Sequence, residues 1–153
     1  MKNVDHIIHH AEEYCRNHGI RLTIKRKHVL TRLIQAEKAL SAYELMDACQ
    51  ENNGEVISAM SVYRILEFLE NETLVHKLNL ANKYVACAHI NCNHTHGVSQ
   101  FLICSNCSKV KEININPNTM ADLQATVQER GFTLIRPQLE MNCLCNDCLV
   151  HAA

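Results

Sequence analysis

The sequence has no apolar run long enough to cross a bilayer as a helix, and residues 1–15 lack the basic and hydrophobic zones of a signal peptide. It also has no surplus of charge, because 15 basic and 16 acidic residues leave a formal net charge of −1. These absences exclude a strong overall field for attracting nucleic acid. We expect a cytoplasmic protein without a membrane partner.

The composition is that of a globular protein, with 47% hydrophobic and 20% charged residues in a chain of 153. This length allows one ordinary domain or two small ones. The chain contains nine cysteines, an odd number. In the reducing cytoplasm they indicate metal ligands or redox thiols instead of a disulfide framework.

Positive charge is concentrated in one segment of the chain. Residues 14–35 contain no acidic side chain and six basic ones: Arg16, Arg21, Lys25, Arg26, Lys27 and Arg32. Such a segment is either a solvated helix face or a surface that contacts a phosphate backbone.

Apolar residues at helical spacing predict helices in the first half of the chain, over 4–17, from Ile24 after the cap Thr23, and over 60–69. A further helix is expected to open at Ser41, where the SAYE sequence has capping-box spacing. Residues 73–87 then read as two strands joined by a polar turn. Three helices followed by a hairpin describe a winged helix-turn-helix, in which the helix before the wing enters the major groove of DNA.

The second half has a different pattern. Strands are expected over 98–104, 109–115 and 132–141, and a helix over 117–131. We therefore predict an α+β protein: a winged helix-turn-helix domain (1–82), a hinge (83–97) and a small α/β domain with a four-cysteine zinc site (98–153).

Two Cys-x-x-Cys pairs lie in this second half, at Cys104 and Cys107 and at Cys145 and Cys148. The spacing lets one tight turn direct both sulfurs at one ion, and four thiolates satisfy tetrahedral zinc. We predict a closed structural zinc site that ties the start of the domain to its end. Cys143 offers a further thiol beside the second pair.

A second, mixed site is expected around the domain boundary. Its candidate ligands are His76 on the wing, Cys87 at the hinge, a histidine of the pair His94 and His96, and Glu112. Nitrogen, sulfur and oxygen donors together suit zinc. An ion held from both sides would fix the angle between the two halves, which is the physical basis of a sensor.

These segments together resemble the ferric uptake regulator family, and within it the zinc uptake regulator branch. The matching stretches are RLTIKRKHVL, SAYELMDA, SVYRILEFL, LVHK, FLICSNCSKVKE and CLCNDC. SAYEL, the cysteine at 87 and the phenylalanine at 101 are the details that point to the zinc branch. The resemblance implies a homodimeric repressor that binds operator DNA when its regulatory metal is loaded, and that represses zinc-uptake genes. It also implies that residues 98–153 form the dimerisation and metal-binding domain.

The resemblance implies two zinc ions per chain, one structural and one regulatory. It assigns the structural ion to the four cysteines of the paired motifs and the regulatory ion to His76, Cys87, His96 and Glu112. The segment from Cys87 to Cys104 is one residue longer than the family pattern, so His94 is an alternative to His96. His89 and Cys92 are further alternatives, and Cys143 stands where no ligand is expected.

For DNA, the resemblance places SAMSVYR at the start of the recognition helix. The residues that it implies as DNA contacts are Tyr43, Ser61, Tyr63, Arg64, Arg21, Lys25 and Arg26. Arginine can bind guanine O6 and N7 through two parallel hydrogen bonds, and tyrosine can contact a thymine methyl group or a phosphate. Tyr63 also fits the apolar face of its helix, so a role in the core is the competing interpretation.

Two other functions stay open at this point. A regulator of the same family could sense another metal or peroxide, although Cys87 disfavours an iron or peroxide site. The Cys-x-x-Cys pairs could form a thiol redox switch, which needs an exposed thiol of low pKa at a helix N-terminus. No enzyme and no small-molecule substrate are expected, since no nucleophile, base and orienting group can be assigned apart from the metal sites.

Overall fold

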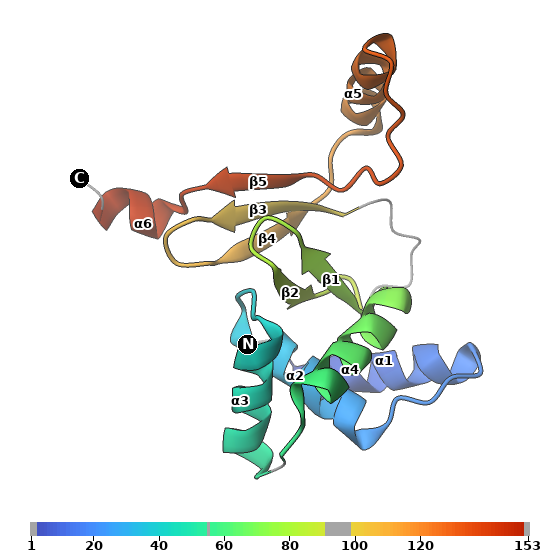
Figure 1. Cartoon of the computed structure of the whole chain (residues 1–153), viewed down its shortest axis with the longest axis vertical. Helices are drawn as coiled ribbons and strands as arrows, with labels where there is room; N and C mark the ends of the chain where they lie inside the picture. Colours follow the sequence, from blue (N-terminus) through green and yellow to red (C-terminus); the bar gives the residue numbers. More distant parts are fainter. Residues whose placement is uncertain (1–2, 55, 91–98, 152–153) are drawn as a thin grey trace.

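The computed structural model describes residues 3–54, 56–90 and 99–151. In Figure 1 the β1–β2 hairpin lies between the N-terminal helices and a three-stranded sheet, and α5 projects away from that sheet. No helix among the described residues is both long and apolar enough to cross a membrane. The helices are α1 (Val4–Asn17), α2 (Ile24–Ala36), α3 (Ala42–Asn53), α4 (Ala59–Asn71), α5 (Pro117–Glu129) and α6 (Asn146–His151). The strands are β1 (Val75–Leu78), β2 (Lys83–Ala86), β3 (Gln100–Cys104), β4 (Val110–Ile113) and β5 (Glu140–Cys143).

The helices of the first half begin where their caps predict. The Thr23 hydroxyl accepts a hydrogen bond from the Arg26 N–H at the start of α2. The Ser41 hydroxyl accepts one from the Glu44 N–H, at 3.1 Å, at the start of α3. Each cap satisfies a backbone donor that has no partner inside the helix, and such a cap is worth about 1 kcal/mol. The predicted helices and their starts are confirmed.

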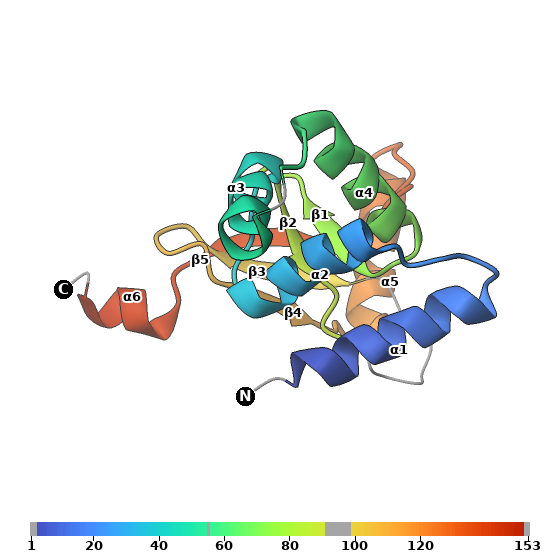
Figure 2. The same cartoon turned by 90° about the horizontal axis from the view of Figure 1, so that it is seen from below.

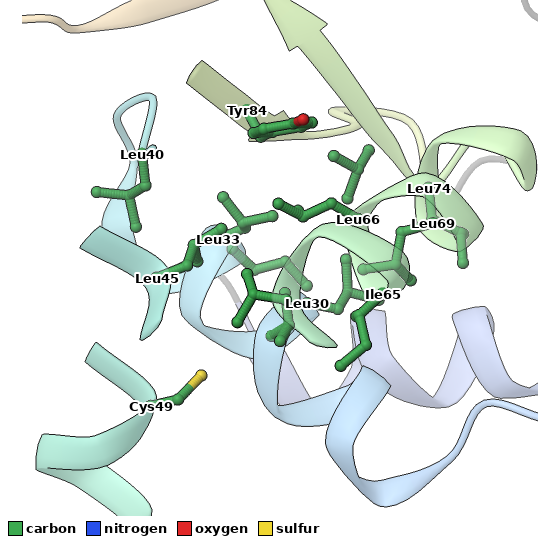
Figure 3. Packing of buried hydrophobic residues seen from close by; sticks show 14 of the residues in the cluster. Leu30, Leu33, Leu40, Leu45, Cys49, Ile65, Leu66, Leu69, Leu74 and Tyr84 are labelled. Atoms are coloured by element: carbon green, nitrogen blue, oxygen red, sulfur yellow. The ribbon is translucent and has the colours of Figure 1, made fainter. Parts of the chain in front are cut away.

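A hydrophobic core holds α2, α3 and α4 together (Figure 3). Leu30, Leu45 and Leu66 come from these three helices and are fully buried. A buried leucine contributes roughly 1.5–3 kcal/mol relative to an exposed one. The core therefore joins the three helices into a rigid platform, and the hairpin packs on it through Val75 and Tyr84.

The first turns of α4 depart from the predicted apolar face. Met60 is 63% exposed and Tyr63 is 44% exposed, whereas Val62, Ile65 and Leu66 are buried. The helix begins at Ala59, so its first turns present Met60 and Tyr63 on the side away from the core. The interpretation of Tyr63 as a core aromatic is therefore wrong.

The two sheets differ in topology. β1 and β2 form an antiparallel hairpin in which Val75 lies opposite Ala86. The other sheet has the order β4-β3-β5, with β4 antiparallel and β5 parallel to the central strand β3. β2 occupies the first four positions of the range predicted as a hinge, 83–97. The domain bounds themselves stay a prediction.

The strand predicted over 132–141 is wrong in most of its length. Only its last two residues are extended in the sheet, as the start of β5 at Glu140. Pro137 has no N–H to give to a strand ladder, which keeps the preceding segment out of the sheet. Phe132 and Ile135 are accordingly 71% and 89% exposed. The short helix α6, which has no counterpart in the sequence-based prediction, follows β5 at the end of the described chain (Figure 2).

A second, smaller cluster of buried residues joins the hairpin to the three-stranded sheet. It consists of Ala39, Leu78, Val85, Phe101 and Ile103. Leu78 and Val85 come from the hairpin, and Phe101 and Ile103 come from β3. The hairpin therefore packs both on the helical platform and on the sheet.

Candidate metal centres

The four cysteines of the two Cys-x-x-Cys pairs lie together. Cys104 ends β3 and Cys107 lies in the turn after it, while Cys145 directly precedes α6 and Cys148 lies in its first turn. Their sulfur atoms lie within 4.8 Å of one another, and Cys107 Sγ is 3.8 Å from Cys145 Sγ. Four sulfurs around one zinc ion, at a Zn–S distance of about 2.3 Å, are separated by about 3.8 Å. The arrangement thus fits tetrahedral zinc.

Backbone groups around the cysteine cluster favour one thiolate. The N–H groups of Cys107, Cys145 and Asn106 lower the pKa of Cys104 to about 6. Asn106 lowers the pKa of Cys148, but Cys145, burial, Cys107 and Cys104 outweigh it and raise that pKa to about 12. These opposite pKa shifts favour the thiolate at Cys104 and the thiol at Cys148, and zinc binding has to displace the thiol protons.

Cys143 does not belong to this cluster. It lies directly opposite Cys104 in the pairing of β3 with β5, and its thiol donates to the Met141 carbonyl at 3.5 Å. Register alone would place Cys143 beside Cys104, but the sulfur atoms that lie within 4.8 Å of one another are those of the two Cys-x-x-Cys pairs. The structure therefore brings Cys145 and Cys148, and not Cys143, into this group.

A second group joins the hairpin to the three-stranded sheet. His76 on β1, Cys87 directly after β2 and Glu112 on β4 offer ligand atoms that all lie within 4.8 Å of one another. His76 Nε2 is 3.6 Å from Glu112 Oε1. Cys87 is 8% exposed, and the Glu112 side chain is 4% exposed. Nitrogen, sulfur and oxygen donors in a nearly dry position suit a zinc ion.

The Glu112 carboxylate is held in place by two donors. The Ser99 hydroxyl donates to Oε1 at 2.5 Å, and the Ala88 N–H donates to Oε2 at 2.8 Å. Both oxygens are thus oriented before any ion is bound, an arrangement typical of the groups that surround metal ligands. Sequence reasoning missed Ser99, because a single serine before a strand carries no signal of its own.

His94, His96 and Cys92 lie outside the described residues, so the choice of His96 over His94 stays a prediction. His89, which is also an alternative, is described. Its Nε2 is 3.8 Å from Glu112 Oε1, and its backbone N–H donates to Cys87 Sγ at 3.5 Å.

The tip of the hairpin makes a further connection to the sheet. Gln138 Nε2 donates to the Lys77 carbonyl at 2.9 Å and to Glu140 Oε2 at 3.1 Å. Glu140 Oε1 accepts from the Leu80 N–H at 3.0 Å. Gln138 and Glu140, near the start of β5, thus form hydrogen bonds with backbone groups of the hairpin. Sequence reasoning missed them because the residues in contact are about 60 positions apart.

The side chains predicted to contact DNA lie mainly on the helical half. Tyr43 on α3 is 59% exposed, and Tyr63 and Arg64 are exposed on α4. Ser61 is half-buried, and its hydroxyl accepts from the Ser58 hydroxyl at the start of α4. Tyr63 and Arg64 are therefore accessible on the helix that precedes the hairpin, and Tyr43 is accessible on α3.

Of the three basic residues predicted against the DNA backbone, Arg21 and Lys25 are exposed. Arg26 is half-buried and is used within the protein. Its Nη1 donates to the Arg21 carbonyl at 2.8 Å, and its guanidinium lies 3.6 Å from the centre of the Phe68 ring. A stacked, hydrogen-bonded guanidinium has less freedom to reach a phosphate than Lys25 has.

Comparison with known proteins gives a consistent result. The model of the ferric uptake regulator family matches residues 17–142. The zinc uptake regulation protein of Escherichia coli (strain K12) is 34% identical over 140 residues, which cover 91% of this chain and 79% of that protein.

Among solved structures, a zinc uptake regulator in complex with zinc and DNA matches with a TM-score of 0.84 and 29% identity, and each chain is covered in full. Holo XcZur matches with a TM-score of 0.77 and 34% identity, over 94% of this chain and 96% of that one. Apo XcZur is 33% identical over 97% and 99% of the two chains, but its TM-score is 0.55. The overall arrangement is thus closer to the holo form than to the apo form.

Proposed function

This chain belongs to the ferric uptake regulator family, and we propose that it is a zinc-responsive repressor that binds operator DNA as a homodimer. The genes that it represses are those of zinc uptake, and its place is the cytoplasm. The observation that carries the proposal is the group of His76, Cys87 and Glu112, which takes donors from the hairpin, the residue after it and the sheet. The family is one of transcription regulators, not a class of enzymes.

The four-cysteine cluster is the structural zinc site in this proposal. Cys104 and Cys107 belong to the first turn of the sheet, and Cys145 and Cys148 follow its last strand. An ion there closes the sheet between sequence-distant ends, so it contributes folding free energy and is not expected to exchange with a mild chelator.

The mixed group is the regulatory site. His76, Cys87 and Glu112 provide three donors, and the family resemblance assigns the fourth to His96. A bound zinc ion would supply one bond to each donor and so tie the hairpin to the sheet. Ser99 and the Ala88 N–H orient the Glu112 carboxylate for this role. Without the ion, the hairpin and the helical platform depend on the smaller buried cluster and on Gln138 and Glu140 for their position.

DNA binding is assigned to the helical half. Tyr63 and Arg64 at the exposed start of α4 read base edges, Tyr43 contacts the adjacent backbone, and Arg21 and Lys25 bind phosphates. In a homodimer two such helices enter successive major grooves, so the angle between helical platform and sheet decides whether both fit at once. The coupling is reciprocal: operator DNA tightens zinc binding by the factor by which zinc tightens DNA binding.

The alternatives from the sequence are not favoured. The curated relatives that match are zinc uptake regulation proteins, and a cysteine in the mixed group disfavours a site for iron or peroxide sensing. A thiol switch at the paired motifs is not favoured either, because the two pairs converge in one four-sulfur cluster that fits a tetrahedral zinc ion.

The test is operator binding at buffered free zinc with Cys87→Ser and, as a matched control, Cys143→Ser. Cys143 lies outside both groups of potential ligands. Cys87→Ser should lose zinc-dependent operator binding by about 100-fold or more, because even residues next to metal ligands cost 10–100-fold when removed. Cys143→Ser should bind like the unchanged protein. If Cys87→Ser binds operator DNA with the affinity of the unchanged protein, the proposed regulatory site is ruled out.

A further inference from the structure

His89 lies in the turn directly after the hairpin, two residues beyond Cys87. Its Nε2 is 3.8 Å from Glu112 Oε1, and His76 Nε2 is 3.6 Å from the same oxygen. Both distances are longer than an N–H···O hydrogen bond, which spans 2.7–3.2 Å. Two ligands of a tetrahedral zinc ion, each bound at about 2.0–2.2 Å, are separated by roughly 3.4 Å. The two imidazoles are therefore spaced around Glu112 like ligands.

The backbone of the same turn supports this arrangement. The His89 N–H donates to Cys87 Sγ at 3.5 Å, and the Ala88 N–H donates to Glu112 Oε2 at 2.8 Å. One short turn thus contacts the sulfur donor and the carboxylate donor of the site. The His89 side chain is 21% exposed, so its ring lies at the edge of the site, between the buried carboxylate and solvent.

Position at the edge distinguishes His89 from the other three donors. The ligand atoms of His76, Cys87 and Glu112 lie within 4.8 Å of one another, and His89 falls outside that mutual distance. Because the ring is partly exposed, a change of its rotamer does not have to disturb the buried core.

We propose that His89 is a second imidazole donor of the regulatory site and takes the fourth position when His96 does not occupy it. This inference rests on the proposed function of the site and adds a ligand that the family resemblance does not assign. With His89, the described residues alone provide two nitrogens, one sulfur and one oxygen, a complete tetrahedral set for zinc. The site then keeps four ligands while zinc is captured or released.

The experiment uses the full-length protein with its four-cysteine site loaded with zinc and with Co²⁺ as the probe of the second site. Co²⁺ affinity is measured by chelator competition, and its visible spectrum reports the number of ligands and the bond to Cys87. The variants are His89→Ala, His89→Gln, His96→Ala and His96→Ala combined with each change at 89. His9→Ala, on exposed α1, is the matched control for loss of a surface histidine.

His96→Ala alone should keep a four-coordinate spectrum, because His89 replaces the missing ligand. Adding His89→Ala or His89→Gln should then lower Co²⁺ affinity by about tenfold or more and weaken that spectrum. His9→Ala should change neither. If both double variants match His96→Ala in affinity and spectrum, His89 is not a ligand and the inference is overturned. A failure of the proposed function would give a different result from a failure of this inference. Cys87→Ser would then bind Co²⁺ at this site as tightly as the unchanged protein.

Discussion

The contact between Gln138 and the hairpin offers a test of the coupling that does not touch a metal ligand. Gln138→Ala removes the donor to the Lys77 carbonyl at 2.9 Å and to Glu140 Oε2 at 3.1 Å. A hydrogen bond contributes about 0.5–1.5 kcal/mol net, and a half-buried carbonyl that loses its donor costs about as much again. We expect the docked arrangement of hairpin and sheet to lose about 1–2 kcal/mol.

This loss should be measurable as a change in zinc sensitivity. Zinc binding favours the docked arrangement. A free-energy cost to that arrangement therefore raises the apparent dissociation constant of the regulatory site for zinc. A loss of 1–2 kcal/mol corresponds to about a 5–30-fold higher free zinc concentration at half-maximal operator binding. Fluorescence anisotropy of labelled operator DNA in zinc buffers measures this midpoint directly.

The matched control is Gln128→Ala, the same change at an exposed position near the end of α5. Gln128→Ala should leave the midpoint within about twofold, and both variants should keep the zinc of the four-cysteine cluster. The reasoning is refuted if Gln138→Ala and Gln128→Ala share the midpoint of the unchanged protein. Docking would then be set by the ion and the buried cluster alone.

Three further predictions follow from the site and the helical half. Ser99→Ala removes the hydroxyl that orients Glu112, so zinc affinity at the regulatory site should fall about 10-fold by chelator competition; an unchanged affinity would contradict the role given to Ser99. Cys104→Ser should release the structural zinc and lower the thermal midpoint, because it removes one of four thiolate ligands from a site whose binding free energy contributes to folding. A variant that keeps this zinc in metal analysis, with an unchanged thermal midpoint, would argue against it. Arg64→Ala should cost about 1–3 kcal/mol of operator-binding free energy and relax the sequence preference, and an equal loss on operator and random DNA would exclude base reading by Arg64. Lys25→Ala should reduce the salt dependence of DNA binding by about one released counterion.

Local signals predicted the elements that depend on local chemistry. Thr23 and Ser41 mark helix starts because their hydroxyls cap backbone N–H groups a few residues away. The two-residue spacing of Cys104 and Cys107 likewise acts within one turn, and it indicated the cluster before any fold was known. The sequence also grouped His76 with Glu112 as candidates across the boundary, which the structure brings within 3.6 Å.

The features that the sequence did not predict depend on contacts between residues distant in sequence or on a local exception to a pattern. The strand expected over 132–141 contains Pro137, whose missing N–H outweighs the alternating pattern around it. Arg26 reads as a free basic residue, but the fold brings Phe68 beneath its guanidinium. The hydrogen bond from Gln138 to the Lys77 carbonyl joins residues 61 positions apart, and no spacing rule relates them.

The central claim is that one exchangeable zinc, held at the mixed site, controls operator binding while a second zinc stays with the four cysteines. Native mass spectrometry of the protein during titration with a mild chelator counts zinc per chain, and the same samples can be assayed for operator binding. The account predicts two zinc ions per chain falling to one, with the fold intact and operator binding lost in step with the first ion released. One zinc throughout, or full operator binding after the first ion has left, would contradict it.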